Sequence, residues 1–120
     1  MDDVWFTEMA DELARCLLDA RSCADAAEAL LESVRGSGDA EVQRVVLDAL
    51  VAPVAVARVL MELLDHPPQL TLAAAHLLRD TSESAALRLT ALGGRVDADE
   101  VIRALGAVVE SSGRLLEVAA

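Results

Sequence analysis

The sequence of residues 13–46, LARCLLDARSCADAAEALLESVRGSGDAEVQRVV, decides the fold class. Its first part repeats apolar side chains at intervals of three and four residues, with charged side chains between them. This spacing is typical of an amphipathic helix. A Gly-Ser-Gly segment then ends the pattern, and Asp39 is a suitable N-cap for a second helix. The stretch therefore predicts two helices joined by a short turn.

The same periodicity continues to the end of the chain between Gly and Pro stops. It predicts four helices, at residues 4–35, 40–65, 69–92 and 98–118. At the start of the last helix, Asp97 and Glu100 have the spacing of a capping box. Because the connections are short, neighbouring helices should pack antiparallel. We therefore expect an all-α antiparallel four-helix bundle, with residues 1–120 in a single domain.

The core should consist of small and medium aliphatic side chains. Hydrophobic residues make up 54% of the chain and aromatic residues only 2%, so Ala, Leu and Val supply the apolar mass. In the first helix the expected buried positions include Cys16, Ala20, Cys23 and Ala27. In the third helix they are Leu70, Ala74, Leu77, Leu78, Thr81, Ala85, Leu89 and Leu92.

The second predicted helix differs from the others because it is apolar nearly all round through its middle. Its residues 49–57 form the longest apolar run in the chain. One small bundle cannot easily cover such a helix, so we expect it to be the most buried helix or to lie in an oligomer contact. Gly106 and Gly113 on the fourth helix mark a second edge at which another helix could approach closely. These features predict a homo-oligomer, most simply a two-fold dimer.

Charge and hydropathy restrict the remaining partners. The formal net charge of −11 disfavours nucleic acid and anionic membrane surfaces, because both attract positive charge. The apolar run of residues 49–57 is far shorter than the roughly 20 residues that a membrane span needs. The first residues lack the basic segment of a signal peptide. We therefore expect a cytoplasmic protein with reduced cysteines and with no nucleic-acid or membrane partner.

No known catalytic signature stands out in the sequence. Neither histidine has a Glu three residues before it, as the inward-facing pairs of ferritin-like di-iron sites require. The Gly-rich phosphate loop, the nucleophile elbow and the HExxH pattern do not occur. Whether the protein is an enzyme stays open, and the sequence leans toward a non-catalytic role.

Cys16 and Cys23 are candidate metal ligands. On one helix they are separated by about 10.5 Å along the axis, which excludes a mutual disulfide and a single metal ion held by these two thiolates alone. In a helical hairpin, Met61 approaches the end of the first helix that bears Cys16, and His76 of the third helix lies near the same level. Thiolate, thioether and imidazole are ligands that Cu(I) favours. The alternative is that each cysteine packs as a small hydrophobe.

The register of Cys16, Ala20, Cys23, Ala27 and Leu30 resembles that of the cysteine-rich four-helix-bundle copper-storage proteins. Those proteins repeat cysteine along inward-facing positions of their helices. The low aromatic content, the Ala-rich core and the four helices also match over most of the chain. The resemblance implies a four-helix bundle, commonly a homo-oligomer, that holds Cu(I) between cysteines. Only Cys16 and Cys23 match the family's ligand positions, and aliphatic side chains replace the other cysteines.

These observations lead to one preferred function and two alternatives. We expect a small non-catalytic helical-bundle accessory or binding protein, an interaction module without a cofactor that resembles copper-storage bundles but lacks most of their ligand cysteines. A further protein partner is possible. The first alternative is a Cu(I)-binding protein that uses Cys16 and Cys23, with Met61 and His76 as further candidate ligands. The second is a bundle whose apolar lumen binds a small molecule or performs catalysis.

Overall fold

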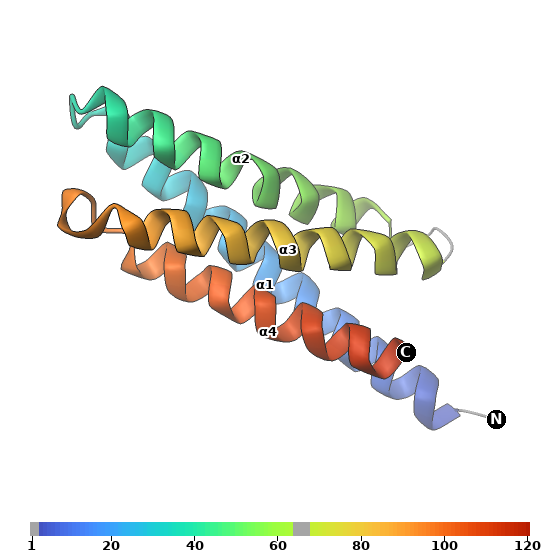
Figure 1. Ribbon diagram of the computed structural model, residues 1–120. Coiled ribbons are helices and arrows are strands. Elements are labelled where there is room, and N and C mark those ends of the chain that lie inside the picture. Colours follow the sequence, from blue (N-terminus) through green and yellow to red (C-terminus); the bar gives the residue numbers. More distant parts are fainter. Residues whose placement is uncertain (1–2, 64–67) are drawn as a thin grey trace.

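The computed structural model describes residues 3–63 and 68–120, with side chains from Thr7 onward. Its elements are α1 (Asp3–Arg35), α2 (Ala40–Glu62), α3 (Pro68–Ala91), the short 3₁₀ helix η1 (Gly93–Arg95) and α4 (Asp99–Ala119). α1 packs against α2 and α4, and α3 packs against the same two helices (Figure 1). The bundle is elongated, 57 × 22 × 17 Å, with α2 and α4 on opposite sides. The predicted all-α antiparallel four-helix bundle is confirmed for this part of the chain.

The predicted ends of the helices agree closely with the observed ones. The boundaries of α1, α3 and α4 differ from the predicted ones by no more than one residue at either end. α2 ends earlier than expected, at Glu62, because Leu63 already serves as its C-cap and donates its backbone N–H to the Leu60 carbonyl at 3.2 Å. The last two residues of the predicted helix, 64 and 65, lie outside the described residues.

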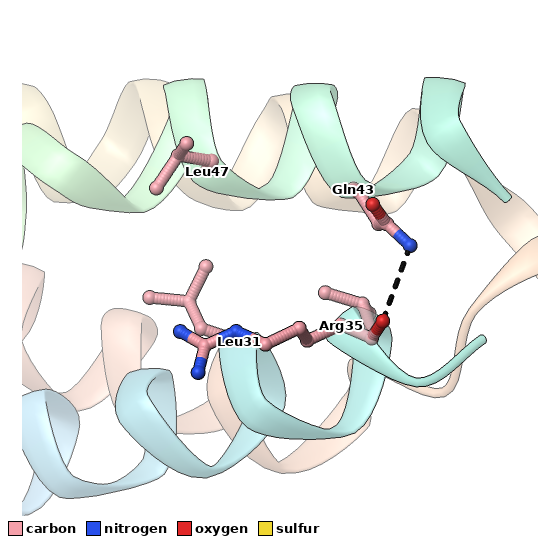
Figure 2. Close-up of a pocket in the computed structure, with 5 residues that line it drawn as sticks. Leu31, Arg35, Gln43 and Leu47 are labelled. Atoms are coloured by element: carbon pink, nitrogen blue, oxygen red, sulfur yellow. Dashed lines mark hydrogen bonds between the residues drawn. The ribbon is translucent and has the colours of Figure 1, made fainter. Parts of the chain in front are cut away.

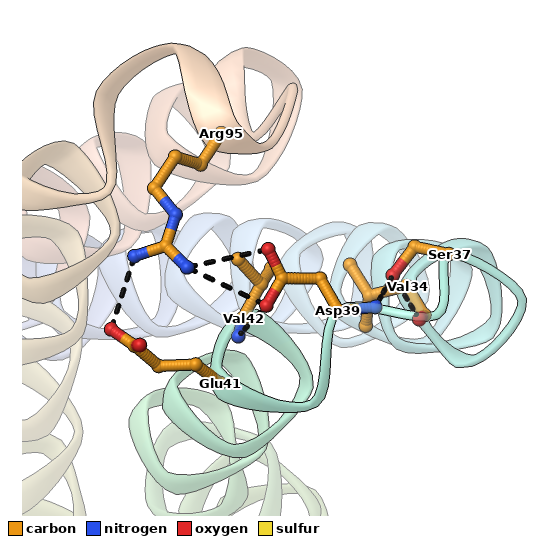
Figure 3. Close-up of polar contacts among 6 residues, drawn as sticks. All are labelled: Val34, Ser37, Asp39, Glu41, Val42 and Arg95. Carbon is orange, nitrogen blue, oxygen red and sulfur yellow. Dashed lines mark hydrogen bonds and ion pairs between the residues drawn. The ribbon is translucent and has the colours of Figure 1, made fainter.

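The N-terminus of α2 is fixed by its cap, as the sequence predicts. The Asp39 side chain accepts a hydrogen bond from the Val42 backbone N–H at 3.2 Å. Across the bundle end, Arg95 of η1 pairs with Asp39 at 3.3 Å and with Glu41 at 3.0 Å (Figure 3). The Val42 N–H, and then Arg95, lower the pKa of Asp39 below its ordinary value of 3.8. The α1–α2 turn and the α3–α4 connection are therefore joined by charge at one end of the bundle.

The predicted capping box of α4 is wrong. Ala98, not Asp97, is the N-cap residue, and it makes no side-chain cap hydrogen bond. Ala98 is buried and its carbonyl accepts from Ile102 N–H at 2.8 Å, so packing in the core fixes it at the position before the helix. Asp97 instead accepts from the Asp99 backbone N–H at 3.4 Å.

The buried face of α3 is rotated from the predicted one. Leu70 and Leu77, expected in the core, are 48% and 53% exposed, and Thr81 is half-buried. The buried positions are Thr71, Ala74, Ala75, Leu78, Ser82, Ala85 and Leu89. Small side chains thus face the centre of the bundle, where they let the helices approach, and the two leucines turn toward a groove beside α2.

The cap of α2 provides a first test of this fold. Asp39→Ala should lower the midpoint of thermal unfolding at pH 7, because it removes both the helix cap and the ion pair with Arg95. Asp39→Asn keeps an oxygen that can accept from Val42 N–H, so its midpoint should lie between those of the wild type and Asp39→Ala. Circular dichroism melts of the three proteins measure the order.

The same variants carry a pH control. Because folding lowers the pKa of Asp39, its charge stabilises the fold at neutral pH, and this contribution is lost as the pH falls through the folded-state pKa. The difference between wild type and Asp39→Asn should therefore shrink in acid. Equal midpoints for wild type and Asp39→Ala at pH 7 would contradict the capping role.

Candidate functional site

Cys16 and Cys23 lie on the inward face of α1, as the sequence predicts. Cys16 is completely buried and Cys23 is 4% exposed, and both belong to the same core cluster as Ala20 and Ala27. Both thiols are free. The helix therefore holds the two sulfur atoms in the interior of the bundle, where they pack among aliphatic side chains from all four helices.

Ser111 of α4 is the polar neighbour of Cys16. Its side chain lies near enough to the Cys16 thiol, across the contact between α1 and α4, to affect the pKa of that thiol. Ser111 and Ser112 are both buried, and their hydroxyls donate to the Val108 carbonyl, at 3.4 Å and 2.5 Å. Ser111 was not predicted from the sequence, although a Ser pair on the apolar stripe of the last helix was a visible signal.

Burial makes both thiols weaker acids than a thiol in water. The loss of solvation raises the pKa of Cys16 to about 11, the neighbouring Ser111 side chain lowers it in part, and nearby Asp19 raises it further. Loss of solvation alone raises the pKa of Cys23 to about 11. The thiolate is the form that binds metals and attacks electrophiles. At neutral pH both side chains are therefore protonated and packed as small apolar groups.

The other two predicted ligands differ from the thiols in their burial. His76 is exposed on α3, whereas both cysteines face the core, and Met61 is half-buried near the end of α2. Within residues 3–63 and 68–120, no group of three or more His, Cys, Asp or Glu side chains is arranged to hold a metal ion. Metal binding by Cys16, Cys23, Met61 and His76 stays a prediction from the sequence.

Two buried oxygens lack a hydrogen-bond partner in the described part of the chain. They are Glu12 Oε2 on α1 and Ser82 Oγ on α3. Ser82 is completely buried within the small-residue face of α3. An unpaired buried hydroxyl destabilises the fold. Ser82 therefore contributes to the core through its small size and not through its hydroxyl.

The solvent side of α2 is the second candidate site. Three of its large apolar side chains are about half exposed: Leu47 at 52%, Val51 at 59% and Val59 at 48%. Ala55 between them is also exposed. We call these residues, together with the exposed charged residues of the same helix side, the α2 face. The complete set is Arg44, Leu47, Asp48, Val51, Ala55, Arg58, Val59 and Glu62.

Apolar grooves run along both sides of this face. Toward α1, Leu31 and Leu47 line a groove that is closed at one end by a hydrogen bond from Gln43 to the Arg35 carbonyl (Figure 2). Toward α3, Val59, Leu70 and Leu77 line a groove whose walls are all apolar residues. The exposed apolar surface is thus wider than α2 itself.

The two edges predicted for an oligomer contact differ in the structure. α2 exposes three large apolar side chains, so the single chain does not cover this helix completely. Around Gly106 and Gly113, a methyl group in place of the hydrogen would meet open space. The folded chain alone therefore gives no steric reason for glycine at these positions, and the homo-oligomer stays a prediction.

Comparisons with known proteins give no further information about the site. Neither a protein-family model, nor a curated protein, nor a solved structure matches the chain significantly. In the described part of the chain, no helix is both long enough and apolar enough to cross a membrane.

The buried thiols predict a specific loss of stability in alkali. The chain contains no Lys and no Tyr, so Cys16 and Cys23 are the side chains that titrate between about pH 8.5 and 11.5. Because folding raises their pKa, the folded state keeps protons that the unfolded state has lost, and stability should fall as the pH rises from about 9 to 11. Guanidinium unfolding with a reductant present, measured across this range, gives the slope.

The control is the double variant Cys16→Ala/Cys23→Ala. Its free energy of unfolding should be lower than that of the wild type at pH 8, because core volume is lost, but nearly independent of pH in this range. Parallel pH profiles for the two proteins would show that the thiols ionise equally well in the folded state.

Proposed function

We propose that the protein is a small non-catalytic helical-bundle module that acts through protein contacts made by the α2 face. The observation that carries the proposal is the half-exposure of Leu47, Val51 and Val59 on one helix, with apolar grooves on both sides. A continuous exposed apolar surface on a small chain is typical of a binding site for another protein.

The interior supports the same reading. Buried Ala, Leu and Val side chains from all four helices form one core cluster, and they occupy the inward positions at which a ligand would otherwise bind. The filled interior therefore favours a function at the surface over an apolar lumen for a small molecule. A partner would therefore bind at the surface of the bundle.

Copper binding is the second candidate, and one observation favours it. Cys16 and Cys23 both face the inside of a four-helix bundle, as the ligands of the copper-storage proteins do. Against it, each thiol must lose a proton that burial holds to about pH 11, and the two are about 10.5 Å apart along α1. A Cu(I) site would need ligands from elsewhere in the chain or from a second copy.

The protein-contact function can be tested in the cells that make the protein. A photoreactive benzophenone amino acid in place of Val51 should give a covalent product with a protein identified by mass spectrometry, because Val51 is 59% exposed at the centre of the α2 face. The matched control places the same amino acid at Ala107, which is exposed on the opposite helix, α4. If neither position 51 nor position 107 gives a covalent product, the proposal is refuted.

The copper alternative has its own measurement. Titration of the reduced protein with Cu(I) against a competing chelator should show stoichiometry well below about one ion per chain, since two separated, protonated thiols cannot form a cluster. The variants Cys16→Ala and Cys23→Ala should leave that weak binding unchanged. Tight binding of about one ion or more per chain, abolished by either substitution, would instead establish the copper function.

A further inference from the structure

The α2 face carries a regular stripe along the whole helix. Its central line consists of Arg44, Asp48, Val51, Ala55, Arg58 and Glu62, all of them exposed. The intervals between these residues alternate between four and three, which is the spacing that keeps two helices in contact over several turns. Leu47 and Val59 flank the line on its two sides, toward α1 and α3 respectively. The stripe thus has the geometry of a helix-pairing surface.

The stripe is also symmetric about the level of residue 53. Each residue of the central line has a counterpart at the same distance on the other side of this level: Arg44 with Glu62, Asp48 with Arg58, and Val51 with Ala55. Both charged pairs join opposite charges, and the third pair joins apolar side chains. A surface with this arrangement is complementary to a copy of itself turned end to end.

We propose that two copies of the chain pair through the α2 face, antiparallel, with the two-fold axis at the level of residue 53. This inference rests on the proposed function and names its partner, a second copy of the chain. In the pair, Arg44 lies level with Glu62 of the second copy, and Asp48 lies level with Arg58 of the second copy. Val51 and Ala55 meet at the centre.

Charge selects the antiparallel arrangement over the parallel one. In a parallel pair each residue would lie level with its own copy, so that Arg44 would face Arg44 and Glu62 would face Glu62. Like charges at these layers oppose association, and opposite charges fix the register. The antiparallel arrangement places four opposite-charge layers around one apolar centre.

The charge of the α2 face also permits a second copy as the occupant. The whole chain carries a net charge of −11, so two copies repel each other over most of their surface. The central line of the α2 face has two arginines and two acidic residues and is therefore neutral. Copies of the chain can approach through this face without adding to the general repulsion.

An ion pair on the surface already orients one of the charges. Arg58 pairs with Glu28 of α1, at the border of the groove between α1 and α2. This contact orients the guanidinium, which has further N–H donors with which Asp48 of the second copy can pair. Exposed ion pairs add little affinity each, so the apolar centre supplies most of the attraction and the charges supply the register.

The first experiment tests whether the α2 face is the interface. Sedimentation equilibrium from about 1 µM to about 300 µM should show a monomer–dimer equilibrium for the wild type. Ala55→Glu should weaken it about tenfold or more, because it buries a carboxylate opposite Val51 of the second copy. Ala107→Glu makes the same change of residue and charge on α4 and should leave the dissociation constant unchanged. Circular dichroism confirms that both variants fold.

The second experiment tests the register by mixing. Arg44→Glu creates chains with Glu at both ends of the stripe, and Glu62→Arg creates chains with Arg at both ends, so each variant alone should dimerise about tenfold more weakly. An equimolar mixture should recover wild-type association as a heterodimer. Positions 44 and 62 are about 27 Å apart within one helix, so the recovery cannot arise inside a single chain.

The outcomes separate the inference from the function on which it rests. A dimer that Ala55→Glu weakens, and that the mixture of charge variants restores, supports the antiparallel pair. A dimer without recovery in the mixture overturns the pairing. A wild type that stays monomeric, while benzophenone at position 51 captures a different protein, overturns the second copy and keeps the proposed function. A monomer with no captured protein overturns both.

Discussion

Close packing of small side chains is the constraint on which the rest of the structure depends. With only 2% aromatic residues, the core cannot be filled by a few large groups. Completely buried positions such as Ala20, Ala27 and Ala75 each contribute one methyl group. Native packing density is reached only if the helices come close together, so every helix must turn small residues inward. Ser82 is accepted in the core for this reason, although its hydroxyl has no partner among the described residues.

The state of the cysteines follows from the same constraint. In a close-packed aliphatic core, a thiol is another small side chain, and the lack of solvent raises the pKa of Cys16 and Cys23 to about 11. The binding of a metal ion by a thiolate must offset the free-energy cost of that desolvation. Many thiolates that share metal ions can do so together, but two that are separated by about two turns of one helix cannot share an ion. Cysteines in an inward register are therefore compatible with a role in packing alone.

The sequence predicted the fold because its signals are local. Helix ends follow from single features such as the Asp39 cap, and the alternation of helices with short turns leaves few other arrangements. The buried face of α3 was misjudged because that helix has apolar residues on several sides, and contact with its neighbours decides between Leu70 or Leu77 and Thr71 or Ser82. The contact between Cys16 and Ser111 depends on the register of α1 against α4, which no local pattern encodes.

The contrast between α2 and α4 gives the strongest physical reason to assign a role to the α2 face. The two helices lie on opposite sides of the bundle and pack against the same two neighbours. The exposed residues in the middle of α4 are small or charged, such as Arg103, Ala107 and Glu110, whereas α2 exposes Leu47, Val51 and Val59. When one chain folds, both helices pack against the same two neighbours, so the bundle needs a similar apolar surface from each. The excess apolar surface of α2 is therefore not needed to build the bundle, and an apolar surface of this kind is typical of a contact with another molecule.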